Sequence, residues 1–147
     1  MKISIWGTRG SLPAPSPDNN EFGGNTSCVS VTQGDTFVIL DAGSGIRRLG
    51  NSLPPGISRI DILLTHLHLD HIMGLGFFLP LYNPNMRVNI WGPTGYKESL
   101  FTRLQRYLSP PLFPIRLQDL PSQPQIFEIN ESSFDIGPFR IKSSYIC

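Results

Sequence analysis

The chain has 147 residues and a hydrophobic content of 39%, a composition typical of one soluble domain with a hydrophobic core. Twelve Lys and Arg residues against eleven Asp and Glu residues give a formal net charge of +1, which excludes a strong long-range field for nucleic acid or an acidic membrane surface. The apolar runs are too short to cross a membrane, and we expect a cytoplasmic protein.

The cysteine content is low. Two cysteines, Cys28 and Cys147, are too few for the dense disulfide framework of a small secreted domain. We therefore expect both to be free thiols without a role in catalysis. The fourteen glycines and fourteen prolines lie between apolar runs, where they indicate turns rather than a low-complexity tract.

The N-terminal part of the chain is predicted to be rich in β-structure. A β-prone run over residues 2–6 is followed by a stretch rich in Gly, Pro, Ser and Asn over 7–25, which predicts a long loop. Loops of that length are often functional. Two β-branched runs at 28–32 and 36–40 flank Gly34, which can supply the positive φ of a tight turn, so they predict a β-hairpin.

Helix and strand patterns alternate in the middle of the chain. A short helix is expected over 46–49, with Ser44 as its N-cap and Gly50 as its end. Residues 59–64 form a nearly continuous aliphatic run, which predicts a strand buried on both faces. The histidines of the chain begin two residues after this run, so we expect them at the C-terminal mouth of a strand.

The second half of the sequence continues this alternation. Five prolines within 109–125 predict a loop or an arm that covers a sheet edge. The expected elements of this half are helices at 70–78 and 94–107 and strands at 87–91, 126–129 and 139–146. Together the patterns predict an α/β fold in one domain.

All three histidines of the chain lie within six residues, at His66, His68 and His71, with Asp70 beside the last. On an extended segment His66 and His68 project to one side and can bind one metal ion. If the chain then turns into a helix, Asp70 and His71 can reach a second ion. This donor set suits zinc best and is compatible with manganese or iron. The alternative is that these histidines line a polar loop or pack in a core, but their clustering favours a metal site.

Four further residues are candidates for supporting roles. Asp41 comes at the end of a predicted strand, two residues before Gly43, so it can either hold a ligand histidine or cap a helix. Asn25 and Thr26 follow paired glycines and can approach the metals or a substrate, although Asn after Gly is also ordinary turn chemistry. Arg9 can fork onto a phosphate, but an exposed arginine is most often only solvated.

Four segments carry a resemblance to a known family. The segment His66-Leu67-His68-Leu69-Asp70-His71 resembles the HxHxDH signature of the metallo-β-lactamase fold. Segments 7–11, 23–28 and 40–45 resemble the phosphodiesterase-like branch of that family, which includes ribonuclease Z and cyclic-phosphodiester hydrolases. The resemblance implies a metallo-β-lactamase-like αββα sandwich, of which this chain covers roughly the first αβ half.

The resemblance also implies a mechanism. His66 and His68 would hold the first metal, Asp70 and His71 would hold the second, and a hydroxide bridging the two metals would attack phosphorus. Asp70 would orient this hydroxide and accept its proton, which makes it the implied catalytic residue. The implied substrate is a small phosphodiester or an RNA end, and the implied cofactor is a pair of zinc ions, with manganese or iron as alternatives. A bound divalent ion lowers the pKa of water to about 7, so such a nucleophile is available at neutral pH.

The family's later ligands have no counterpart in this sequence. A complete member supplies a further histidine, a bridging aspartate and a last histidine after the signature, whereas no histidine follows His71 here. We therefore interpret residues 1–147 as a single, truncated domain. One sheet of a sandwich leaves an apolar face uncovered, and such faces drive association, so we expect a homo-oligomer or a missing C-terminal half.

Three functional hypotheses follow. The first is a two-metal phosphodiesterase to which this chain supplies four ligands, with weak metal binding and little or no activity in isolation. The second is a truncated or degenerate domain that acts in protein association without catalysis. The third keeps the metal pair but changes the substrate to a thioester or a lactam.

Overall fold

The computed structural model of the chain describes residues 1–17 and 21–145 and contains two sheets. The larger sheet has six strands in the order β1-β2-β3-β4-β5-β6, antiparallel from β1 to β3 and parallel from β3 to β6. Its strands are β1 (Lys2–Gly7), β2 (Cys28–Gln33), β3 (Thr36–Leu40), β4 (Arg59–Leu63), β5 (Arg87–Pro93) and β6 (Gln125–Ile129). The smaller sheet is the antiparallel hairpin of β7 (Ser132–Ile136) and β8 (Phe139–Ser143).

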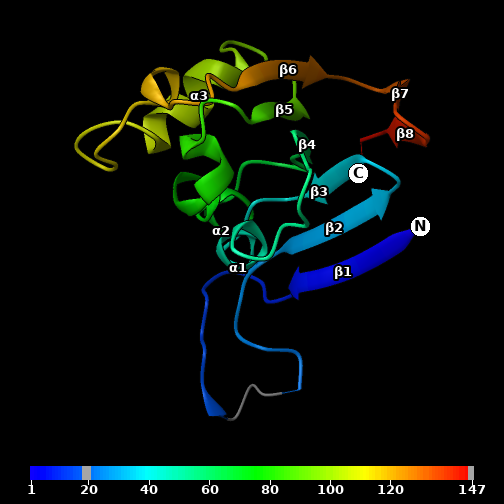
Figure 1. Cartoon of the computed structure of the whole chain (residues 1–147). Coiled ribbons are helices and arrows are strands. Elements are labelled where there is room, and N and C mark those ends of the chain that lie inside the picture. The colour runs from blue at the N-terminus through cyan, green and yellow to red at the C-terminus, as the bar shows by residue number, and fades with distance from the viewer. Residues whose placement is uncertain (18–20, 146–147) are drawn as a thin grey trace.

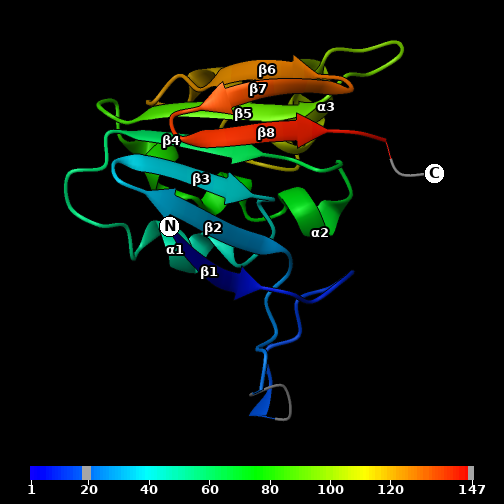
Figure 2. The same cartoon turned by 90° about the vertical axis from the view of Figure 1, so that its right-hand side faces the viewer.

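The helices and the β7–β8 hairpin lie on opposite faces of the six-stranded sheet (Figures 1 and 2). The helices are α1 (Ile46–Gly50), α2 (Leu69–Ile72) and α3 (Leu100–Tyr107), with 3₁₀ turns at Leu75–Phe77, Leu79–Tyr82 and Leu117–Asp119. Apolar side chains of the sheet, the helices and the 3₁₀ turns form the main core. A second, smaller core forms on the other face, where Ile136 of β7 packs with Val38 and Leu63. One αβ half and the beginning of a second sheet layer are therefore present, which confirms the predicted fold class.

The strand predictions agree with the structure in most places. The β2–β3 hairpin turns at Gly34, whose φ of 57° is the positive value expected for this turn. The predicted burial of β4 on both faces is also confirmed, because Ile60 through Leu63 are all buried. The strand β7 was not predicted, and it turns into β8 at Gly137, which has a φ of 54°. The strand predicted over 139–146 ends at Ser143, and Ile146 lies outside the described residues.

Two of the three helix predictions were too long. The helix expected over 70–78 stops at Ile72, because the backbone N–H of Gly74 donates to the carbonyl oxygen of Ala42 at 2.9 Å instead of continuing the helical hydrogen bonds. The helix expected over 94–107 begins only at Leu100, where the Ser99 side chain accepts a hydrogen bond from the backbone N–H of Thr102. The spacing of apolar residues does not show which residue is the N-cap, and the N-cap determines where the helix begins.

The caps of α1 also differ from the prediction. Gly45, not Ser44, is the N-cap, because the Ser44 hydroxyl accepts a hydrogen bond from the Thr26 backbone N–H instead. Gly50 lies within α1, and Asn51 is the C-cap. Among the described residues no helix is long and apolar enough to cross a membrane.

Cys28 lies at the start of β2 and is fully buried as a free thiol, as predicted. Burial, with a smaller contribution from the negative charge of Asp41, raises the pKa of this thiol to about 12. The thiol therefore stays protonated and unreactive near neutral pH. The prediction for Cys147 lies outside the described residues.

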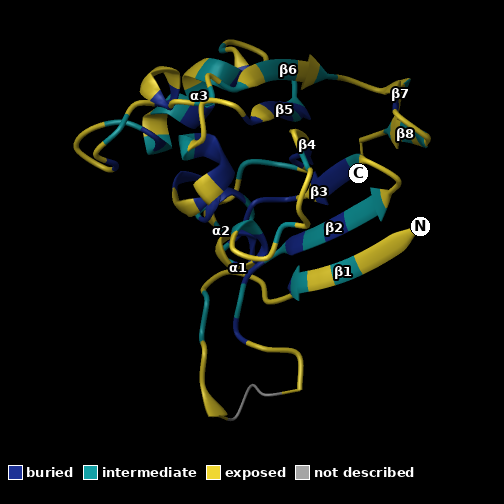
Figure 3. Ribbon diagram, viewed as in Figure 1, coloured by how far each residue is buried: buried dark blue, intermediate teal, exposed yellow. Residues whose placement is uncertain are grey.

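The main core contains buried residues of both the sheet and the helices, which are dark blue in Figure 3. Phe78 is 0% exposed there, whereas Phe22, in the N-terminal loop, is 73% exposed. We predict that Phe78→Ala lowers the free energy of unfolding by about 3–5 kcal/mol, because it removes buried surface and leaves a cavity. The matched control Phe22→Ala should change it by less than about 0.5 kcal/mol. Urea denaturation followed by circular dichroism measures both, and equal effects would contradict this description of the core.

Candidate metal centre

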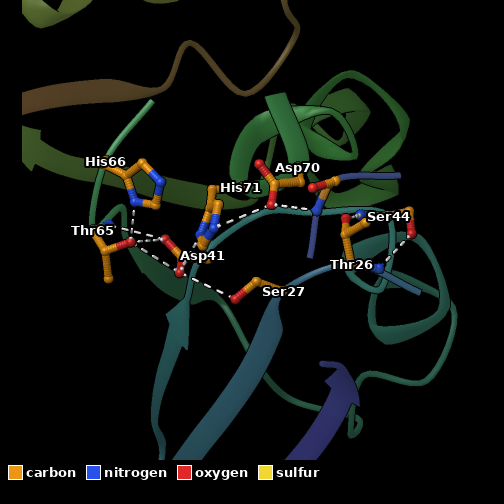
Figure 4. A network of polar contacts seen from close by, with 9 residues as sticks. Thr26, Ser27, Asp41, Ser44, Thr65, His66, Asp70 and His71 are labelled. Atoms are coloured by element: carbon orange, nitrogen blue, oxygen red, sulfur yellow. Dashed lines mark hydrogen bonds and ion pairs between the residues drawn. The ribbon is translucent and has the colours of Figure 1, made fainter. Parts of the chain in front are cut away.

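Three of the predicted site residues, Asp41, His66 and His71, meet at the carboxyl ends of β3 and β4 (Figure 4). These strands are parallel and pair through Leu40 and Leu63, so the chain leaves both at the same edge of the sheet. Asp41 follows β3 directly, and the histidine segment follows β4. Parallel pairing therefore places the carboxylate next to the histidines although the sequence separates them by more than twenty residues.

Asp41 is the centre of this arrangement. It is 5% exposed, and its φ of 60° is a left-handed conformation that non-glycine residues seldom adopt. Its Oδ1 accepts hydrogen bonds from the backbone N–H and the hydroxyl of Thr65, both at 2.9 Å. Its Oδ2 lies 3.2 Å from the donating Ser27 hydroxyl and 2.8 Å from Nδ1 of His71. Of the two roles considered for Asp41, the structure shows the contact with a histidine and places Gly45 at the helix cap.

These contacts determine which ring nitrogen of His71 carries a proton. A carboxylate accepts hydrogen bonds, so Nδ1 of His71 must be the donor to Asp41. Nε2, which lies 3.5 Å from Oδ2 of Asp70, is then left to act as a ligand atom in the neutral ring. An imidazole held through one nitrogen by a carboxylate is the usual arrangement of a metal-ligating histidine.

The three imidazole rings are close together. The ring centroid of His66 lies 4.5 Å from that of His68 and 4.0 Å from that of His71. Burial lowers the pKa of His66, and repulsion by the other two rings lowers it further, partly offset by Asp41 and Asp70. A lowered pKa keeps His66 neutral near pH 7, the form that binds a metal.

The long N-terminal loop reaches the carboxylate of Asp70. The backbone N–H of Ser11 donates a hydrogen bond to Oδ2 of Asp70 at 2.9 Å, across 59 residues of sequence. Ser11 has a φ of 66°, so the loop presents this amide from a left-handed turn. The Ser11 hydrogen bond is the main reason that the pKa of Asp70 lies below its ordinary value.

The other three candidates fix the conformation and position of this loop. Nε of Arg9 donates to the carbonyl oxygen of Leu12 at 2.9 Å and so closes the loop on itself. Thr26 is buried, and its Oγ1 accepts a hydrogen bond from the backbone N–H of Ser44 at 2.8 Å. The side-chain oxygen of Asn25 accepts one from the Ser44 hydroxyl at 3.1 Å. The contacts of Thr26 and Asn25 join the loop to the turn before α1, and none of these contacts is with a histidine.

The structure also adds residues that sequence reasoning missed. Thr65 and Ser27 contact Asp41, and Ser11 contacts Asp70. Thr65 directly precedes the first histidine, which is a weak local signal. Ser11 has no such signal, because its contact depends on how the loop folds back. A sequence pattern indicates side chains at short spacing. It does not indicate backbone N–H donors from segments that are distant in the sequence.

The chemistry of the donors fits a divalent metal. Imidazole nitrogens and a carboxylate are donor types that zinc prefers. Asp41 contacts His71 directly and His66 through Thr65, as the outer hydrogen-bond partners of metal ligands do. Within the described residues, however, no three His, Cys, Asp or Glu side chains form a group that could hold one ion. The arrangement therefore gathers and orients suitable donors without forming a closed cage.

Comparison with known proteins identifies the family. The model of the metallo-beta-lactamase superfamily matches residues 22–138, so the chain belongs to this superfamily. Ribonuclease Z of Nanoarchaeum equitans is 33% identical over 97% of this chain, and ribonuclease Z of Agathobacter rectalis is 30% identical over 100% of it. The predicted resemblance to the phosphodiesterase-like branch is thereby confirmed.

Solved structures show the same fold. The Bacillus subtilis metallo-beta-lactamase fold protein YhfI matches 94% of this chain with a TM-score of 0.64 at 19% identity. The short form of human tRNase Z matches 92% of it with a TM-score of 0.54 at 24% identity. The chain spans 42% and 46% of the lengths of the two ribonuclease Z relatives, and 50% and 56% of the lengths of these two solved chains.

The first prediction for this site concerns Asp41→Asn. The side-chain amide has one oxygen and one NH₂ group in place of the two carboxylate oxygens. The two Thr65 donors favour the oxygen at the Oδ1 position, so the NH₂ group would take the Oδ2 position beside His71. Nδ1 of His71 would then face a donor and lose its proton to Nε2, which could no longer bind a metal. We predict zinc affinity about 10–100-fold weaker than in the wild type, measured by competition with a chromophoric chelator. Ser27→Ala removes one donor to Asp41 and leaves the His71 contact, so an equal loss in this control would contradict the argument.

The second prediction concerns Ser11→Pro, which removes the amide donor to Asp70 and, because proline fixes φ near about −65°, also ends the left-handed conformation of this position. The pKa of Asp70 should rise toward its ordinary value, because the charged form loses its main hydrogen bond. The depressed pKa stabilises the fold above the ordinary carboxyl range, and this contribution is lost as the pH falls through the folded-state pKa. NMR titration of the Asp70 carboxyl carbon in the metal-free chain measures the change. Ser11→Gly keeps the N–H and suits a positive φ, so the pKa should stay low there; a rise in both variants, or in neither, would refute the assignment.

Proposed function

We propose that this chain supplies metal-binding side chains to a metal-dependent phosphodiesterase. The observation that carries the proposal is the buried Asp41 carboxylate, which contacts His71 directly and His66 through Thr65. Supporting evidence comes from the superfamily match over residues 22–138 and from relatives named ribonuclease Z. His66 and His68 would hold one ion and Asp70 and His71 a second, with zinc favoured over manganese or iron.

A divalent ion bound there would supply Lewis-acid chemistry, by activating water near neutral pH and neutralising charge on phosphoryl oxygens. The chain's own residues would prepare the site for it. Asp41 and Thr65 would fix the rings of His71 and His66, and the Ser11 amide would fix one oxygen of Asp70. We assign Asp70 the role of proton acceptor, because its lowered pKa keeps it ionised near neutral pH.

The proposed substrate is a phosphodiester, either an RNA end or a small molecule. The names of the relatives support this class over thioesters and lactams. A net charge of +1 provides little general attraction for RNA, so recognition would depend on local groups. A cytoplasmic location belongs to the same proposal, since the buried Cys28 is a free thiol.

We also propose that turnover needs groups beyond this chain's four ligands. The relatives are more than twice as long as the part that this chain matches, as the coverage of 42% for the Nanoarchaeum equitans protein shows. We therefore keep the interpretation of residues 1–147 as a single, truncated domain. The remaining ligands would come from a C-terminal half or from a second copy.

One observation supports association with a partner, which the second hypothesis requires. Ile3 and Ile5 of β1 are 59% and 67% exposed, at an edge of the large sheet that the β7–β8 hairpin does not cover (Figure 2). Exposed apolar residues on a sheet edge favour association. This surface is compatible with both hypotheses, because a partner that covers it could also supply ligands.

The test is metal binding together with hydrolysis. Zinc content per chain is measured by mass spectrometry after equilibrium dialysis, and bis-p-nitrophenyl phosphate, a thioester and a lactam are assayed side by side with added zinc or manganese. We expect weak zinc binding that Asp70→Asn reduces at least about tenfold, little or no turnover by the chain alone, and a preference for the phosphodiester wherever turnover occurs.

Asp119→Asn is the matched control, because Asp119 is an exposed carboxylate in the 3₁₀ turn at Leu117–Asp119. It should leave zinc binding unchanged. Near-stoichiometric zinc with phosphodiester turnover would show that a partner chain completes the site and would exclude the purely associative role. Absence of zinc binding by the wild-type chain, or an equal effect of both substitutions, would contradict the proposed function.

A further inference from the structure

We propose that Thr65 is a positioning residue that links the Asp41 carboxylate to His66, so that one buried carboxylate orients two imidazole rings. The inference rests on the proposed function, because it assigns Thr65 to the same site. The residue stands outside the HxHxDH signature and was not among the residues that the sequence pattern predicted. Its role follows from counting the protons available to a short chain of hydrogen bonds.

The Thr65 hydroxyl oxygen has polar neighbours on two sides. It lies 2.9 Å from Oδ1 and 3.1 Å from Oδ2 of Asp41, and 3.0 Å from Nδ1 of His66 (Figure 4). The backbone N–H of the same residue donates to Oδ1 of Asp41 at 2.9 Å. Both the main chain and the side chain of Thr65 are therefore held by a single carboxylate.

The hydroxyl has only one proton to give. Because the Asp41 carboxylate only accepts, this proton must point toward Asp41. The hydroxyl oxygen is then left with its lone pairs toward His66, so Nδ1 of His66 must carry the proton of the bond between them. The neutral ring of His66 is thus fixed with Nε2 unprotonated, which is the same tautomer that Asp41 imposes on His71.

This arrangement makes the two rings dependent on one group. The ring centroids of His66 and His71 are 4.0 Å apart, so the two rings are close neighbours. Hydrogen bonds at both Nδ1 atoms leave both Nε2 atoms available to ligands, without a separate carboxylate for each ring. Loss of the hydroxyl would release His66 alone, since His71 contacts Asp41 directly.

Thr65→Val tests the role, because valine has nearly the shape of threonine but no hydroxyl. Thr65 is exposed, so the substitution does not change the hydrophobic core. The hydrogen bond from the backbone N–H of residue 65 to Asp41 is retained. Thr65→Ser is the matched control, since it keeps the hydroxyl. The first readout is the tautomer of each histidine, from long-range ¹H–¹⁵N correlation spectra of the metal-free chain at a pH where the rings are neutral.

We expect Nδ1-protonated His66 and His71 in the wild type and in Thr65→Ser. In Thr65→Val, His66 should become a mixture of tautomers while His71 remains unchanged. The second readout is zinc affinity, which we expect to be about tenfold weaker in Thr65→Val and within about twofold of the wild type in Thr65→Ser. A merely structural role for Thr65 would not change one ring and spare the other.

The inference is overturned if His66 of the wild type is protonated on Nε2, or if Thr65→Val leaves the His66 tautomer unchanged. It is also overturned if the tautomer changes while zinc affinity stays at the wild-type value. Absence of zinc binding by every variant, the wild type included, would overturn the proposed function instead. In that case the tautomer spectra still decide whether Thr65 positions His66, so the two failures are distinguishable.

Discussion

The site depends on one buried carboxylate. Asp41 adopts a left-handed backbone conformation at the end of β3, and this conformation brings its side chain to the end of β4. There it accepts hydrogen bonds from Ser27, which precedes β2, and from Thr65 and His71, which follow β4. A buried charge is tolerated only when such donors satisfy it, so the carboxylate and its partners hold one another in place.

The sequence predicted the local features of the site and of the fold. The spacing of His66, His68 and His71 and the turn at Gly34 are short-range patterns, and the structure places these residues as a close cluster and a hairpin turn. Contacts that depend on tertiary folding were not predictable. Ser11 reaches Asp70 across 59 residues, and no local pattern marks a backbone amide as a donor.

Tertiary contacts also explain the errors in the predicted elements of the fold. The helix that contains Asp70 is short because the backbone N–H of Gly74 donates to the carbonyl oxygen of Ala42, a tertiary contact that helical periodicity does not contain. The strand β7 was missed because only Ile136 in it is buried, and it packs against Val38 and Leu63 on the far face of the sheet. Its presence shows that the second layer of the fold already begins within this chain.

The central claim is that the side chains gathered around Asp41 bind a metal through imidazole nitrogen. The X-ray absorption spectrum of the zinc-loaded chain tests this claim most directly. We expect nitrogen and oxygen ligands at about 2.0–2.1 Å, with the outer-shell scattering that imidazole rings produce. Sulfur ligands at about 2.3 Å, or a spectrum without imidazole scattering, would show that zinc binds elsewhere and would contradict the claim.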